Sequence, residues 1–140
     1  MASEPGALVL LTRLARLVYR RATEDILGMR VKQLAALSYL RQFPGVSQRQ
    51  VGEAMHLDAN NCVLLLNDIE AAGWGQRRRD PEDRRRHIVE ITDEGLRALE
   101  RAERALDGLE DEVLGALSLD ERDALREMLE KAVADVPAAA

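Results

Sequence analysis

The sequence predicts a mainly α-helical domain with one small β-hairpin, and three observations support this. Charged residues make up 32% of the 140-residue chain and β-branched runs are few, which favours helices. Aromatic residues make up only 3%, so a core must consist of aliphatic side chains. One turn-forming cluster, residues 80–83 (DPED), lies between two short strand-like segments. We expect six helices and one hairpin.

Helical periodicity and turn residues define the first two helices. Apolar residues recur at helical spacing from residue 7 to residue 27, and Gly28 interrupts the pattern. A second helix follows at 31–42. The Phe43-Pro44-Gly45 segment ends it, because proline cannot continue a helix and glycine supplies the turn.

Capping residues define the next two helices. Ser47 and Gln50 form a capping box, so a short third helix begins at residue 48 and stops near residue 55. Asp58 can cap a fourth helix, which ends at Gly73. Two helices joined by three or four residues, with the second one capped, have the spacing of a helix-turn-helix.

The hairpin and two long helices complete the chain. The expected strands are 74–79 and 86–91. Thr92 caps a helix over 93–116, and a second capping box starts the last helix, 119–134. A hairpin directly after a helix-turn-helix is a wing, so the fold class is a winged helix-turn-helix.

The charge distribution favours a polyanionic partner, although the net charge is −5. Residues 1–92 hold 14 basic and 11 acidic residues, whereas residues 93–140 hold 6 and 14. The local field matters more than the total for binding DNA.

The hairpin carries the clearest functional signal. Arginine side chains on a narrow tip can enter the minor groove of DNA, where the negative potential attracts them. The alternative is an ordinary solvated surface. The arginines are Arg77, Arg78, Arg79, Arg84, Arg85 and Arg86.

The capped helix at 58–73 is the candidate reading helix. Asn60 and Asn61 lie in its first turn, and asparagine can make a bidentate contact to adenine in the major groove. Alternatively, they only assist capping. Ser47, Gln48 and Arg49 begin the preceding helix, where phosphate contacts would fix the register.

Residues 31–97 resemble the MarR family of winged-helix transcription regulators. The matching segments are VSQRQVGEAMHLD, LLLNDIEAAGW and RRRDPEDRRRHIVEITDEG, with LSLDERDAL near the C-terminus. The resemblance implies an obligate homodimer whose DNA-binding lobe is residues 31–92. Residues 1–30 and 93–140 would form the dimerisation helices.

The resemblance also implies roles for single residues. Asn60 and Asn61 would face the groove, Arg84 and Arg85 would be wing-tip contacts, and Asp83 would order the wing by pairing with arginine. It further implies a small ligand, often phenolic or lipophilic, between the dimerisation helices and the DNA-binding lobe.

Three residues depart from the family pattern. Val63 and Leu64 stand where polar or basic residues are common. Val63 could touch a thymine methyl group, whereas Leu64 has no polar role. Gly75 replaces an apolar strand residue, which should loosen the first wing strand. We therefore expect the hairpin to carry much of the DNA affinity.

Two tyrosines and two arginines are candidates for an effector site. Tyr19 with Arg13 or Arg16 could recognise an anionic aromatic ligand, and Tyr39 lies near the same region; plain core packing is the alternative. Helical phase places Cys62 with Leu65, Leu66 and Ile69 on the buried face of its helix, so packing is favoured over a redox sensor.

We therefore expect a cytoplasmic, nucleoid-associated transcription regulator, acting as a repressor. It would bind a palindromic operator as a homodimer and be released by a small ligand. The alternatives are a protein-interaction module without DNA, supported by Val63 and Leu64, and a cysteine-based redox regulator.

No enzyme, cofactor or metal site is expected, since no catalytic or ligand constellation stands out. The first apolar run, interrupted by Arg13 and Arg16, indicates neither a signal peptide nor a membrane span.

Overall fold

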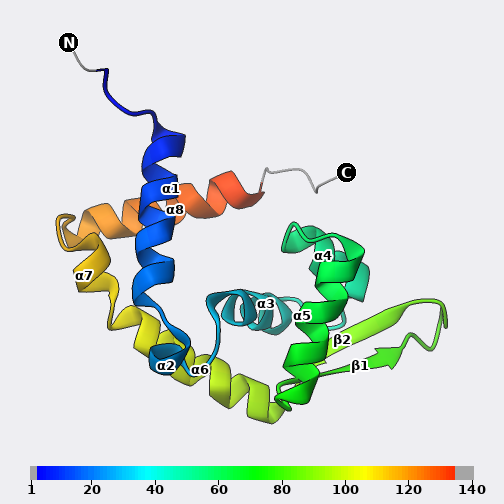
Figure 1. The fold of residues 1–140 in the computed structure, drawn as a ribbon. Helices are drawn as coiled ribbons and strands as arrows, with labels where there is room; N and C mark the ends of the chain where they lie inside the picture. Colours follow the sequence, from blue (N-terminus) through cyan, green and yellow to red (C-terminus); the bar gives the residue numbers. More distant parts are fainter. Residues whose placement is uncertain (1–2, 135–140) are drawn as a thin grey trace.

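The computed structural model describes residues 3–134, and Figure 1 shows helices around one hairpin. A two-stranded sheet, β1–β2, is formed within these residues. The elements in chain order are α1 (Ala7–Arg21), α2 (Glu24–Leu27), α3 (Val31–Gln42), α4 (Gln48–Ala54), α5 (Ala59–Ala71), β1 (Gly75–Arg79), β2 (His87–Ile91), α6 (Asp93–Asp107), α7 (Glu110–Leu114) and α8 (Leu119–Ala134).

The predicted fold class is confirmed, but two of the six predicted helices are each divided. The expected helix at 7–27 breaks at Ala22, whose ψ of 65° is not helical. The break turns the chain so that Ala22 and Leu27 both enter the core, which the periodicity of α1 alone did not reveal. The expected helix at 93–116 is interrupted at Gly108, a residue of low helix propensity.

The predicted caps are confirmed. The Asn61 N–H donates to Asp58 Oδ1 at 2.8 Å, and the Gly95 N–H donates to Thr92 Oγ1 at 3.0 Å. Both predicted capping boxes form, at Ser47 with Gln50 and at Ser118 with Glu121. These bonds satisfy N–H groups that a helix start otherwise leaves unpaired.

The base of the hairpin is fixed to the core. Its antiparallel ladder runs without interruption from the pair Gly75–Ile91 to the pair Arg79–His87. Val89, at the centre of β2, is buried, and its N–H donates to the Val46 carbonyl at 2.9 Å. The hairpin therefore projects from the segment that also starts α4.

Gly75 does not loosen the first strand, contrary to the expectation from sequence. A Cβ atom at this position would lie 2.8 Å from the Ile69 Cγ2 atom and 3.2 Å from the Glu90 carbonyl oxygen. The absence of a side chain lets β1 approach α5 closely. The glycine is thus a packing requirement, and the ladder remains complete.

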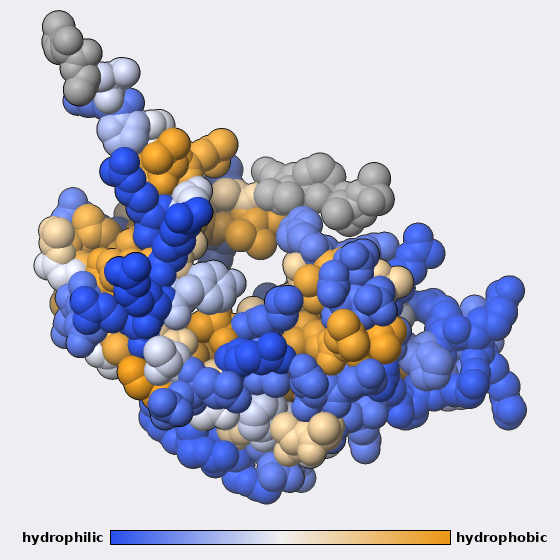
Figure 2. All heavy atoms as spheres, in the orientation of Figure 1, coloured by the Kyte–Doolittle hydropathy of each residue, from blue (hydrophilic) through white to orange (hydrophobic). Residues whose placement is uncertain are grey.

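The core lies where α2–α6 meet the hairpin, whereas α1 and α8 have no buried residue. Apolar side chains on these two helices are exposed, and Figure 2 shows orange atoms gathered around them while the hairpin is blue. The exposed residues are Leu8, Val9, Leu10, Leu11, Leu119, Met128, Leu129 and Val133. Within residues 3–134, no helix has the length and apolar character needed to cross a membrane.

A bidentate ion pair joins α3 to α6. The two terminal nitrogens of Arg41 donate to the two carboxylate oxygens of Glu103 at 2.5 and 2.6 Å. This hydrogen bonding lowers the pKa of Glu103 below its ordinary value of 4.5 and raises that of Arg41. The pair therefore stabilises the packing of these two helices.

We predict that Glu103→Gln lowers stability near neutral pH by about 1 kcal/mol or less, because the pair is partly exposed. A lowered folded-state pKa contributes stability above about pH 4.5, and this is lost as the pH falls through the folded value. Thermal melts should thus show a difference from the wild type near neutral pH that shrinks in acid. Glu127→Gln, on the exposed surface of α8, controls for charge loss; an equal effect there would contradict the prediction.

Candidate nucleic-acid interface

One face of α5 is buried in the core, and this determines which side chains the opposite face exposes. Cys62, Leu65, Leu66 and Ile69 are buried, as the sequence predicted. The four-residue connection from α4 contains His56 in the left-handed region, with φ of 54°. This turn sets α5 across α4 in a helix-turn-helix.

The exposed face of α5 is partly polar and partly apolar. Asn60, Asn61 and Asn67 are exposed, and Val63 is half-buried. Leu64 is 53% exposed, so the departure noted in the sequence lies on the surface. The Asn61 side-chain N–H also donates to Asp58 Oδ2 at 3.2 Å, so Asn61 assists the cap while its own oxygen is left for other partners.

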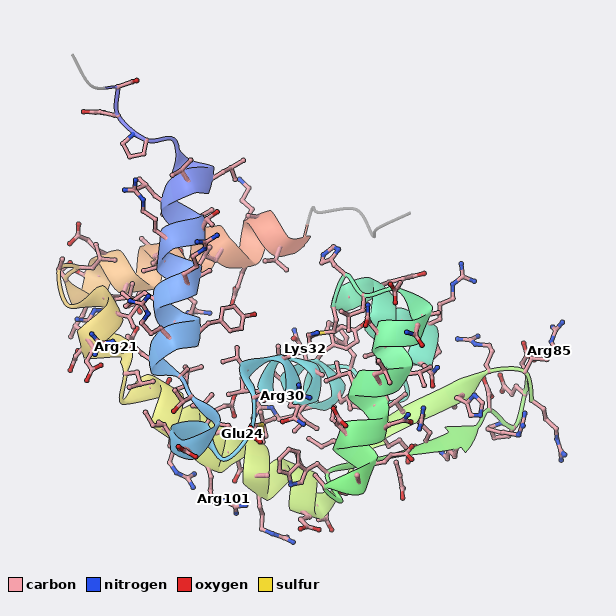
Figure 3. All side chains as sticks on the ribbon, in the orientation of Figure 1. Arg21, Glu24, Arg30, Lys32, Arg85 and Arg101 are labelled. Atoms are coloured by element: carbon pink, nitrogen blue, oxygen red, sulfur yellow. The ribbon has the colours of Figure 1, made fainter. Side chains whose placement is uncertain are left out.

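Hydrogen bonds within the tip order the wing. Arg79 Nη1 donates to the Arg84 carbonyl at 2.7 Å, across the turn. Asp83 Oδ1 accepts from both the N–H and the Nε of Arg85, at 3.1 and 3.2 Å. Arg85 is nevertheless 92% exposed, and Figure 3 shows it projecting from the end of the hairpin away from the helices.

A groove of about 910 Å³ separates the wing from the helix-turn-helix. The first turn of α4, the start of α5, and Arg85, Arg86 and His87 of the hairpin line it. Within it, Gln48 is half-buried, and Arg49 is exposed beside Glu53, with 3.2 Å between Arg49 Nε and Glu53 Oε1.

Ser47 is one of the residues that line this groove. It was expected to offer a phosphate contact, but the residue is buried and its hydroxyl accepts the Gln50 N–H at 3.1 Å. As an acceptor the hydroxyl caps α4, and the chain enters this helix directly beneath β2, where Ser47 bridges Ile88.

Besides Arg85, which pairs with Asp83 at the tip, two of the six hairpin arginines are engaged in ion pairs. Arg78 lies 2.9 Å from Glu90, and Arg77 Nε lies 2.6 Å from Glu70 Oε1. Hydrogen bonds from these arginines lower the pKa of each carboxyl. Fewer of the hairpin arginines are therefore available to an anionic partner than the sequence indicates. The exposed cations are concentrated at Arg84, Arg85 and Arg86.

Cys62 is buried, and its Sγ lies 3.5 Å from the Gln48 carbonyl oxygen. Burial raises the pKa of this thiol, which disfavours the reactive thiolate. The geometry therefore favours packing over redox sensing.

A second groove, of about 850 Å³, lies between α3–α4 and α8. Tyr39 lines it together with Phe43, and their ring centroids are 4.9 Å apart. Arg126 of α8 lies on the opposite wall. The predicted ligand residues Arg13, Arg16 and Tyr19 are exposed on α1 and are not among its lining residues.

Sequence reasoning missed Phe43 and Arg126. The spacing of Tyr39 and Phe43, four residues apart, could have indicated an aromatic pair on one helix face. Nothing in the sequence places α8 opposite that face. In residues 3–134 no group of three histidine, cysteine or acidic side chains is arranged to hold a metal ion.

Comparisons with known proteins agree with this geometry. A model of the MarR family matches residues 27–86. The transcriptional regulator HosA of Escherichia coli O111:H- is 30% identical over 99 residues, which are 71% of this chain and 73% of HosA. The chain spans only 57% and 65% of the length of two other curated relatives.

Solved structures give the same fold. The PcaV transcriptional regulator from Streptomyces coelicolor, in complex with its natural ligand, has a TM-score of 0.74 at 26% identity over 96% of this chain and 99% of its own. The transcriptional repressor CouR, bound to a 23-mer DNA duplex, has a TM-score of 0.77 at 28% identity over 94% and 99%. Since the MarR model matches the helix-turn-helix and most of the wing, and HosA is 30% identical over most of both chains, the chain belongs to the MarR family of winged-helix transcriptional regulators.

Proposed function

We propose that the chain is a DNA-binding transcription regulator that acts as a repressor in the cytoplasm, at the nucleoid. The observation that carries this proposal is the hairpin tip, where exposed arginines project beside a helix-turn-helix. The similarity of the chain to the solved structure of the repressor CouR bound to a DNA duplex supports it. Since the family consists of transcriptional regulators, we propose binding without catalysis.

The exposed face of α5 would enter the major groove. Asn60 and Asn61 would supply direct base contacts, and Val63 would meet a thymine methyl group. Gln48 and Arg49, at the start of α4, would fix the register through phosphates. Arg79 would hold the turn of the wing rather than read DNA, since its side chain is bonded to the Arg84 carbonyl.

The wing would enter the adjacent minor groove. Arg84, Arg85 and Arg86 are exposed there, and a narrow minor groove attracts guanidinium groups. Asp83 would order the tip for this contact through its bonds to Arg85. Because Leu64 gives α5 no polar contact at its position, the wing would carry a large share of the affinity.

A homodimer is proposed because α1 and α8 leave apolar faces uncovered in the single chain. A twofold dimer presents two reading helices, so the operator would be an imperfect palindrome with half-sites about one helical turn apart. Residues 1–30 and 93–140 would form the dimerisation region, and residues 31–92 the DNA-binding lobe.

A small effector is proposed for the groove between α3–α4 and α8. Tyr39 and Phe43 offer an aromatic wall, and Arg126, whose Nη1 also donates to Glu130 Oε1 at 2.5 Å, offers a cation to an anionic or phenolic ligand. A ligand there would touch both the DNA-binding lobe and a dimerisation helix. It would release DNA by favouring a spacing of the two lobes that no longer matches the grooves.

The strongest competing function is a protein-interaction module, since Leu64 is an exposed apolar residue on the reading helix. A DNA-binding selection from a pool of random-sequence duplexes separates the two functions. Enrichment of a palindromic motif, with affinity that falls steeply with salt, supports the regulator.

We predict that Arg85→Ala weakens binding to the selected duplex roughly tenfold or more, about 1–3 kcal/mol, because a wing contact to DNA is lost. Fluorescence anisotropy at several salt concentrations measures it. Arg101→Ala, an exposed arginine on α6 and far from the wing, is the matched control (Figure 3). Equal affinities for the wild type and Arg85→Ala would show that the wing does not contribute to DNA binding.

We predict that Leu8→Asp converts the homodimer to monomers, because Leu8 is 78% exposed and lies on the proposed dimer face of α1. Sedimentation velocity measures the change. Leu64→Asp places the same charge on an exposed leucine of α5 and should stay dimeric. A wild type that sediments as a monomer at micromolar concentration would contradict the proposed dimer.

We predict that benzoate raises the melting temperature more than benzylamine does, because Arg126 favours an anionic ring substituent and ligand binding stabilises the native state. Arg126→Glu should reverse this order, and Tyr39→Ala should remove both shifts. Lys131→Glu, an exposed charge reversal on the same helix but outside the groove, is the control. If benzoate still raised the melting temperature of both Arg126→Glu and Tyr39→Ala, this groove would not be the effector site.

A further inference from the structure

Arg77 differs from the other hairpin arginines in how it is used. Its side chain is 20% exposed, compared with 92% for Arg85 at the tip. It lies opposite the buried Val89 in the ladder, so it is on the hairpin face that packs against the helices. In Figure 1, β1 begins directly after α5 and the hairpin runs outward from that end.

The donors of Arg77 are directed at two other elements, α5 and α4. Its backbone N–H and its Nε both donate to Glu70 Oε1, at 3.0 and 2.6 Å. Its Nη2 donates to Asn67 Oδ1 at 2.5 Å, and its Nη1 donates to Gln48 Oε1 at 3.5 Å. One guanidinium therefore connects β1 to the exposed side of α5 and to the first turn of α4.

The charge of Arg77 is already compensated inside the fold. Its hydrogen bond to Glu70 lowers the pKa of that carboxyl, which keeps the carboxylate ionised beside the guanidinium. An arginine whose Nε and both terminal nitrogens have protein acceptors is poorly placed to bind a phosphate as well. Its effect on DNA must then pass through the groups it holds.

Those groups are two amides whose orientation matters. An amide side chain has one acceptor oxygen and one donor NH₂ group, and an unconstrained amide can present either. Since Arg77 engages the oxygens of Asn67 and Gln48, both residues are left to present donors. Asn67 lies on the exposed part of α5, and Gln48 lies in the groove beside the wing.

We infer that Arg77 is a specificity-determining positioning residue, which fixes the Asn67 and Gln48 amides as hydrogen-bond donors toward DNA. A donor from Asn67 in the major groove selects acceptor edges, namely O6 and N7 of guanine, N7 of adenine and O4 of thymine, whereas the donor from Gln48 would bind a phosphate and fix the register. The inference rests on the proposed DNA-binding function and deepens it, since it assigns sequence preference to a residue that does not touch DNA.

The test compares Arg77→Met with Arg78→Met, which removes the neighbouring arginine of the same strand. Each variant is measured against the duplex selected by the wild type and against a scrambled duplex, at several salt concentrations. Arg77→Met should lose at least tenfold on the selected duplex and little on the scrambled one, with an unchanged salt slope. Arg78→Met should keep the wild-type ratio of the two affinities.

Two results overturn the inference. An unchanged ratio in folded Arg77→Met shows that the amides need no arginine. Equal losses on both duplexes, with a salt slope reduced by about 1, show that Arg77 is a phosphate contact.

Arg77→Lys keeps the inference testable if Arg77→Met does not fold. Lysine retains the charge beside Glu70 but lacks the planar fork that reaches Asn67 and Gln48 together, so the same loss of ratio is expected. The wild-type ratio in folded Arg77→Lys overturns the inference.

The outcomes also distinguish a failure of this inference from a failure of the proposed DNA-binding function. A wild type that enriches no sequence overturns the proposed function and the inference together. A wild type that enriches a motif, beside Arg77 variants that keep its ratio, overturns the inference alone.

Discussion

The burial of one stripe of α5 is the constraint on which the rest of the interface depends. With Leu66 and Ile69 in the core, the helix cannot rotate, so its asparagines must face outward. The same stripe sets the position of the wing, because Gly75 allows β1 to lie directly against Ile69. A change in the packing of this stripe would therefore move the reading helix and the hairpin together.

Electrostatics are arranged locally rather than through the total charge. A chain of net charge −5 still presents cations at the hairpin tip, because acidic residues are concentrated after residue 92. Along the hairpin, side-chain exposure divides the arginines into two groups, since Arg85 stays exposed although it pairs with Asp83. Those near the base, such as Arg77 and Arg78, hold the protein together, and those at the tip remain exposed.

The two parts of the molecule differ in how completely they bury their apolar residues. The helix-turn-helix and hairpin bury most of theirs within one chain, whereas α1 and α8 bury none completely. The groove with Tyr39 lies between these two parts. Whatever covers α1 and α8, and whatever fills this groove, would act on the relative placement of the two reading helices of a dimer.

The sequence alone determined the features that depend on neighbours in the chain. The caps at Asp58 and Thr92, the hairpin turn and the buried stripe of α5 all follow from local hydrogen bonding and periodicity, and the structure confirms them. The break at Ala22, the need for glycine at position 75 and the shared partners of Arg77 were decided only by the tertiary structure. Each depends on atoms distant in sequence, since close packing and side-chain hydrogen bonds form only when separate elements dock.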